Sequence, residues 1–141
     1  MKIQEIQREI IDEFSMFDEE NWDERYQYLI DLGKTLPLID EQYKTDENLI
    51  KGCQSKVWLH GAENEGKITF TADSDAILTK GIIAILIRTF SNQEPSEILK
   101  ADTKFIDEIG LKEHLSPTRA NGLVSMIKQI KMYALAFDSK N

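Results

Sequence analysis

The segment from Ala76 to Phe90 restricts the fold of this chain more than any other part of the sequence. Apolar residues fill almost every position, and the polar exceptions are Thr79, Lys80 and Arg88. A helix that is apolar on nearly every side is stable only when other elements surround it. We therefore expect a central helix here, with Asp73-Ser74-Asp75 just before it supplying the N-cap and the acidic residues of the first turn.

The segments on both sides of this helix have the periodicity of covering helices. From Ile3 to Phe17 apolar residues recur every three or four positions, while acidic residues occupy the other face. Ser116 followed by Pro117 is a helix-start pair, and a repeating apolar pattern follows it. The helices expected around the central one span residues 3–17, 22–33, 94–99, 103–110 and 117–137.

Two short segments have the alternating pattern of β-strands. Polar and apolar residues alternate loosely from Ser55 to His60 and cleanly from Lys67 to Ala72, and Asn64-Glu65-Gly66 between them is a turn sequence. A lone hairpin is marginal in water, so it needs a third strand, for which Asn48–Lys51 is the candidate, or covering helices. The sequence predicts an α+β fold in which several helices pack a small antiparallel β-sheet.

Length and charge limit the number of domains and the class of partner. The 141 residues suit a single domain over 1–141. The 25 acidic residues outnumber the 17 basic ones, and no basic run is present, so we expect no nucleic-acid partner. Residues 1–10 lack the apolar core of a signal peptide, and the longest apolar run, 81–87, is far shorter than the roughly 20 residues of a membrane span. We expect a cytoplasmic protein with no membrane partner.

Cys53 is the only cysteine, so one chain cannot form an internal disulfide or a four-cysteine metal site. It follows Gly52, which frees the backbone for a tight turn, and it lies between Lys51 and Lys56. A nearby lysine favours the thiolate of a cysteine. Free cysteines are often buried, but a turn between lysines is an unusual place for core packing, which favours a chemical role.

The run from Lys44 to Trp58 surrounds this cysteine with a specific sequence. Further distinctive stretches cover nearly the whole chain: Tyr28-Leu29-Ile30-Asp31-Leu32-Gly33-Lys34 with Leu36-Pro37, Asp73-Ser74-Asp75-Ala76 with Lys80-Gly81, and Leu115-Ser116-Pro117-Thr118-Arg119 with Gly122-Leu123. Together these stretches resemble the SufE family of sulfur-acceptor proteins. Lys51 and Lys56 stand where relatives often carry Arg and Gln, which leaves the polarity of the loop intact.

The resemblance implies a function for Cys53. SufE proteins accept the terminal sulfur of a persulfide from a pyridoxal-phosphate (PLP) cysteine desulfurase, activate that desulfurase, and pass the sulfur to iron–sulfur cluster assembly. PLP then belongs to the partner, and this chain is expected to need no cofactor or metal and not to be a free-standing enzyme. The implied partners are a SufS-type cysteine desulfurase and iron–sulfur scaffold proteins. The implied fold is SufE/NifU-like, in a monomer or weak homodimer.

The resemblance also implies roles for particular residues. Cys53 is the expected catalytic residue, and the expected partner-binding residues are Lys51, Gly52, Gln54, Asp75 and Arg119. Two of these have simpler explanations. Arg119 is expected in the first turn of the last helix, where the helix dipole disfavours a cation, so a local ion pair would explain it equally well. Capping alone would explain Asp75.

Two other functions fit parts of the sequence. A cysteine-dependent hydrolase or transferase would use His60 or His114 to activate Cys53, and that histidine would have to lie within hydrogen-bonding reach. An acidic protein-interaction module would need Cys53 only for packing. No C-x-x-C or H-x-x-x-H spacing indicates a metal site.

A sulfur carrier must also protect its cargo, because any thiol attacks an exposed persulfide. Leu49, Ile50 and Val57 are near enough in sequence to form an apolar cover over Cys53, and burial there would raise the pKa of the thiol. We therefore expect a closed loop in the free protein and an open loop in the complex with the desulfurase.

Overall fold

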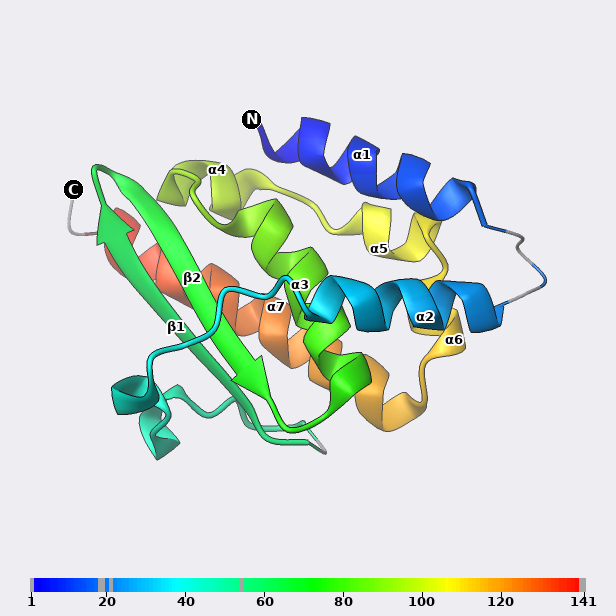
Figure 1. Ribbon diagram of the computed structural model, residues 1–141. Coiled ribbons are helices and arrows are strands. Elements are labelled where there is room, and N and C mark those ends of the chain that lie inside the picture. The colour runs from blue at the N-terminus through cyan, green and yellow to red at the C-terminus, as the bar shows by residue number, and fades with distance from the viewer. Residues whose placement is uncertain (1, 18–19, 21, 54, 140–141) are drawn as a thin grey trace.

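The computed structural model describes residues 2–17, 20, 22–53 and 55–139, apart from the side chains of Lys112 and His114. Helices pack against one side of a two-stranded antiparallel sheet, which is the predicted α+β class (Figure 1). The elements in chain order are α1 (Ile3–Ser15), α2 (Trp22–Gly33), the 3-10 helices η1 (Glu41–Tyr43) and η2 (Asp46–Asn48), β1 (Val57–Asn64), β2 (Lys67–Ser74), α3 (Ile77–Phe90), α4 (Pro95–Lys100), α5 (Lys104–Glu108), α6 (Leu111–His114) and α7 (Pro117–Asp138).

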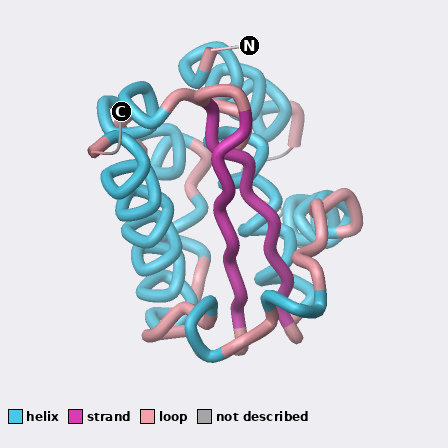
Figure 2. The backbone as a smooth tube through the Cα atoms, turned by 90° about the vertical axis from the view of Figure 1, so that its left-hand side faces the viewer, coloured by secondary structure: helices cyan, strands magenta, loops and turns pink. Residues whose placement is uncertain are grey.

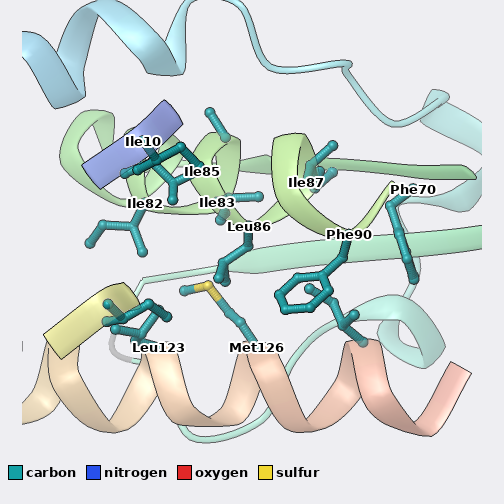
Figure 3. Close-up of a cluster of buried hydrophobic side chains, with 14 of the residues drawn as sticks. Ile10, Phe70, Ile82, Ile83, Ile85, Leu86, Ile87, Phe90, Leu123 and Met126 are labelled. Atoms are coloured by element: carbon teal, nitrogen blue, oxygen red, sulfur yellow. The ribbon is translucent and has the colours of Figure 1, made fainter. Parts of the chain in front are cut away.

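Helix α3 is the centre of the fold, as its sequence predicts. Every residue from Gly81 to Ile87 is buried, and the helix contacts α1, α2, α7 and β2. Figure 3 shows Ile82 and Leu86 of α3 facing Leu123 and Met126 of α7 across the space between the two helices. Burial of these apolar side chains is the main force that holds the layers together.

The hairpin forms as predicted, but β1 begins at Val57 instead of Ser55, and both strands run past their predicted ends at His60 and Ala72. Leu59 pairs with Ala72 and Gly61 with Phe70, and all four are buried. Figure 2 shows the two strands running together along the length of the molecule, with helices behind and beside them. Alternation works here because one face of the sheet packs on the core and the other is more open to solvent.

The third strand proposed over Asn48–Lys51 is not formed. Leu49 makes one isolated bridge to Trp58, and the Ile50 N–H donates to the Val57 carbonyl at 2.8 Å. The chain then turns at Gly52, whose φ is +89°. Pairing therefore stops after this short contact, and within the described residues the sheet has two strands.

The start of α3 differs from the predicted cap. Asp73 and Ser74 are the last residues of β2, paired with Trp58 and Val57 of β1. Helix α3 begins two residues after Asp75, and its first turn holds no acidic residue. Strand pairing with β1 therefore takes precedence over the local capping signal.

The start of α7 agrees with its prediction. The Ser116 hydroxyl accepts a hydrogen bond from the Arg119 N–H at 3.3 Å, and Pro117 is the first helical residue. This cap fixes the orientation of the helix end that borders the Cys53 loop. Within the described residues no helix combines the length and the apolar character that a membrane crossing requires.

Polar contacts also tie α1, α2 and α3 together. Arg88 of α3 donates to Glu13 of α1 at 2.8 Å and to Glu9 at 3.1 Å. Tyr28 of α2 donates its hydroxyl hydrogen to the same Glu13 carboxylate. The Arg88 guanidinium lowers the pKa of Glu13, against the effect of burial. Burial and the Glu13 carboxylate raise the pKa of Tyr28 to about 12.

Candidate functional site

The Cys53 loop lies between η2 and β1 and is held at both ends. At its start, Ile50 is bonded to Val57 as described above. At its end, the Lys56 N–H donates to Asp75 Oδ1 at 3.1 Å, and the Asp75 N–H donates to the Lys56 carbonyl at 3.3 Å. Asp75 is exposed and ties the end of the loop to the connection between β2 and α3. Its predicted place in a helical first turn is wrong, because its carboxylate instead receives a backbone N–H of the Cys53 loop.

The Cys53 side chain turns inward and rests against α7. The thiol is half-buried, and it donates a weak hydrogen bond to the Gly122 carbonyl, with 3.8 Å between Sγ and the oxygen. Burial raises the pKa of the Cys53 thiol. The free protein therefore holds Cys53 as a neutral thiol at neutral pH, because burial disfavours the charged thiolate.

A small cavity adjoins the thiol. Its lining comes from the loop, α3 and α7: Cys53, Ser55, Thr79, Ile82, Thr118, Arg119, Gly122 and Met126. The remaining space is about 10 Å³, close to the roughly 10–15 Å³ that one water molecule needs. Figure 3 shows two of the lining residues, Ile82 and Met126, projecting between α3 and α7. The expected apolar cover is wrong in its residues: Leu49, Ile50 and Val57 do not line this cavity, and Ile50 and Val57 line a second, apolar one.

Two glycines allow the loop to approach α7 closely. Gly52 has a positive φ, and a Cβ there would lie 3.0 Å from Ser125 Oγ. A Cβ on Gly122 would lie 3.3 Å from Cys53 Sγ. The sequence marks Gly122 only by its place in a stretch that resembles the SufE family, and it gives Ser125 no mark. A glycine inside a helical pattern is a signal of close packing, but the sequence does not say which segment packs there.

Two cations of the Cys53 loop and one that lines its cavity are exposed to solvent. Lys51, Lys56 and Arg119 are exposed, and none of them forms an ion pair with another described residue. Arg119 lies in the first turn of α7, as predicted, and shares the Cys53 cavity. The local ion pair that would explain Arg119 without a partner is therefore not seen in the described part of the chain.

Among the described residues, the remaining candidates are not seen in contact with the Cys53 thiol. His60 stacks on Tyr43, with 3.9 Å between the ring centroids, and no hydrogen bond links it to Cys53 among the described residues. The side chain of His114, and Gln54 as a whole, lie outside the described residues. Within the part of the chain that the structure describes, no group of three His, Cys, Asp or Glu residues is arranged to hold a metal ion.

A solved structure supports the fold. The solution structure of a hypothetical protein from Thermus thermophilus superposes with a TM-score of 0.78, covering 95% of this chain and 96% of that one. The two sequences are 18% identical, so this similarity concerns the arrangement of the elements alone.

Sequence comparisons identify the family. Residues 8–134 match SufE, described as an Fe–S metabolism associated domain. An uncharacterized SufE-like protein of Rhizobium meliloti is 46% identical over 131 residues, which cover 89% of this chain and 92% of that protein. A second uncharacterized SufE-like protein, from Rhizobium etli, is 42% identical over 128 residues, covering 87% of this chain and 85% of that protein. With its cysteine loop seated on α7 and this match along most of its length, the chain belongs to the SufE family.

Proposed function

We propose that this protein is a sulfur acceptor in Fe–S metabolism, in which Cys53 takes sulfur from a PLP-dependent cysteine desulfurase of the SufS type. The observation that carries the proposal is the inward-facing thiol of the only cysteine, at a small cavity that it shares with the exposed Arg119. Membership of a family associated with Fe–S metabolism supports the same role. The protein then acts as a partner that relieves the desulfurase of its product, and not as a free-standing enzyme.

The chemistry needs only one sulfur from this chain. The Cys53 thiolate attacks the outer sulfur of a persulfide on the desulfurase, so a new sulfur–sulfur bond forms at Cys53. The sulfur–sulfur bond on the desulfurase breaks, and its cysteine leaves as a thiolate. One thiolate is consumed and one is released, so the step requires no external oxidant or reductant. In a second exchange of the same kind, a thiolate of a scaffold protein attacks the outer sulfur on Cys53, and Cys53 leaves as a thiolate.

Charge around the loop supports docking of an acidic partner surface. The whole chain has a formal net charge of −8, yet Lys51 and Lys56 of the loop and Arg119 at its cavity form no ion pair within the described structure. A protein of the same sign of charge is repelled by most of this surface and attracted at the loop. Docking would therefore orient Cys53 toward the partner's persulfide.

Transfer also requires the loop to open. In the closed state burial raises the pKa of Cys53, which lowers the fraction of reactive thiolate. A desulfurase that contacts the loop only in its open form would shift the population toward an outward-facing thiol. The closed state then protects the thiol, and later the persulfide, between encounters.

The direct test is sulfur transfer followed by intact mass. The protein is incubated with a SufS-type desulfurase and cysteine, and its mass is measured without reductant. A gain of about 32 Da, one sulfur atom, is expected on Cys53. Cys53→Ser should fold normally, gain no sulfur and fail to stimulate the desulfurase, since an alcohol is a poor nucleophile toward sulfur. Stimulation of the desulfurase by the serine variant at the wild-type level would refute the proposal.

A further inference from the structure

We propose that Gly122 is a positioning residue for Cys53, because the absence of a side chain at this point of α7 creates the seat for the inward-facing thiol. The proposal deepens the proposed function, on which its biological meaning rests. Its geometry and its test, however, concern this chain alone.

The contact geometry singles out the sulfur atom. A Cβ at position 122 would lie 3.3 Å from Cys53 Sγ but 3.8 Å from both Cα and Cβ of Cys53. The second and third distances are ordinary van der Waals contacts, whereas the first is tighter than most contacts of real Cβ atoms. Alanine at 122 would therefore crowd the sulfur and leave room for the loop backbone.

A glycine at position 122 is unfavourable for the helix, so its presence indicates a packing requirement. Gly122 lies inside the 22-residue helix α7 and is buried, where alanine would favour the helix more. The same turn of α7 receives a second loop residue, since a Cβ on Gly52 would lie 3.0 Å from Ser125 Oγ. Gly52 and Cys53, which are adjacent in the loop, thus pack against one turn of α7. Gly122 is the α7 residue that lies against the reactive sulfur.

The consequence is a link between position 122 and thiol reactivity. At 3.3 Å from an alanine Cβ, the sulfur must give way by a few tenths of an ångström, and Cys53 does so by rotating its side chain or lifting away from α7. Either movement separates the sulfur from the Gly122 carbonyl and exposes it to solvent. Because burial raises the pKa of this thiol, exposure brings the pKa back toward its ordinary value and makes the thiol more reactive at neutral pH.

The experiment is alkylation of Cys53 by iodoacetamide, followed by intact mass across a pH series, with no desulfurase present. Gly122→Ala is compared with Asn121→Ala, an exposed neighbour on the same turn. We expect Gly122→Ala to react about threefold faster or more at neutral pH, with its alkylation profile shifted to lower pH. Asn121→Ala should match the wild type. Wild-type rate and pH profile in a natively folded Gly122→Ala would overturn the proposal.

A thermodynamic cycle covers the case in which Gly122→Ala does not fold well. The alanine is introduced both into the wild type and into Cys53→Ala, and thermal midpoints are compared. If the sulfur is the crowded atom, Gly122→Ala is better tolerated in the Cys53→Ala background than in the wild type. An equal change in both backgrounds would refute the proposal. Absence of sulfur uptake by the wild type would refute the proposed function and leave both of these readouts valid.

Discussion

Lys56 and Asp75 hold each other by two hydrogen bonds that close the Cys53 loop: the Lys56 N–H donates to the Asp75 carboxylate, and the Asp75 N–H donates to the Lys56 carbonyl. The two residues are 19 positions apart, at the start of β1 and just beyond the end of β2. The carboxylate therefore acts as a latch between the loop and the body of the fold.

Removing this latch should loosen the loop with little effect on global stability. Asp75→Ala loses the acceptor of the Lys56 N–H, and at an exposed position this should cost about 1 kcal/mol or less. The expected result is faster alkylation of Cys53, with a thermal midpoint near that of the wild type. Asp75→Asn keeps an oxygen at the same place and is the matched control. Identical alkylation rates for alanine, asparagine and wild type would show that the latch does not restrain the loop.

Local sequence patterns predict the elements that depend mainly on neighbouring residues. The apolar segment of α3 and the alternation in β1 and β2 are local signals, and both predictions are confirmed. Asp73-Ser74-Asp75 has the same local chemistry as a helix cap, but pairing of Asp73 and Ser74 with β1 decides its structure. Capping chemistry is shared by turns and strand ends, so only the tertiary pairing distinguishes them.

The sequence names candidate residues of the site but does not predict where the thiol packs. Cys53 and Arg119 stand out as single residues, one by its uniqueness and one by its place in a helical first turn. The acceptor of the thiol hydrogen is Gly122, 69 positions from Cys53. No periodicity links two segments so far apart, and the packing of the loop against α7 follows only from the complete fold.

The Glu13–Arg88 pair should make stability depend on pH in the acid range. Because the pKa of Glu13 is lowered in the folded protein from its ordinary 4.5, the unfolded chain binds the proton more tightly. The contribution of this pair is therefore complete above the ordinary pKa and is lost as pH falls through the lower, folded value. Glu13→Gln should lower the free energy of unfolding at neutral pH by about 1 kcal/mol and flatten its decline in acid.

Urea unfolding at neutral pH and at about pH 3.5 measures this effect. Asp12→Asn is the control, since it removes a neighbouring exposed carboxylate of the same helix. Parallel pH dependences in the wild type and in Glu13→Gln would show that the pair does not contribute.

Metal removal should leave the protein unchanged. Within the described residues no cluster of metal-ligating side chains is present, and folding coupled to a metal ion requires such a cluster. We expect the same thermal midpoint and the same sulfur uptake with and without EDTA. Stoichiometric zinc or iron in the purified protein, together with a lower midpoint after chelation, would contradict this.

Arg119 should matter for docking and not for the reactivity of the thiol. Its side chain shares the Cys53 cavity without an ion pair in the described structure, so its charge is available to a partner. Arg119→Ala should take up sulfur from the desulfurase about tenfold more slowly, while its alkylation by iodoacetamide is no slower than in the wild type. Salt should slow the wild type toward the rate of the variant, because screening weakens the same attraction.

Arg8→Ala is the matched control for this last prediction. It removes the same positive charge from an exposed position on α1, which Figure 1 shows at the opposite side of the molecule from the loop before β1. Arg119→Lys separates charge from geometry, since lysine keeps the charge but loses the planar two-pronged donor. Equal rates of sulfur uptake for Arg119→Ala and Arg8→Ala would show that Arg119 acts only through the net charge of the protein. Equal losses toward iodoacetamide and toward the desulfurase would place the defect in the seat of Cys53 and not in the encounter with the partner.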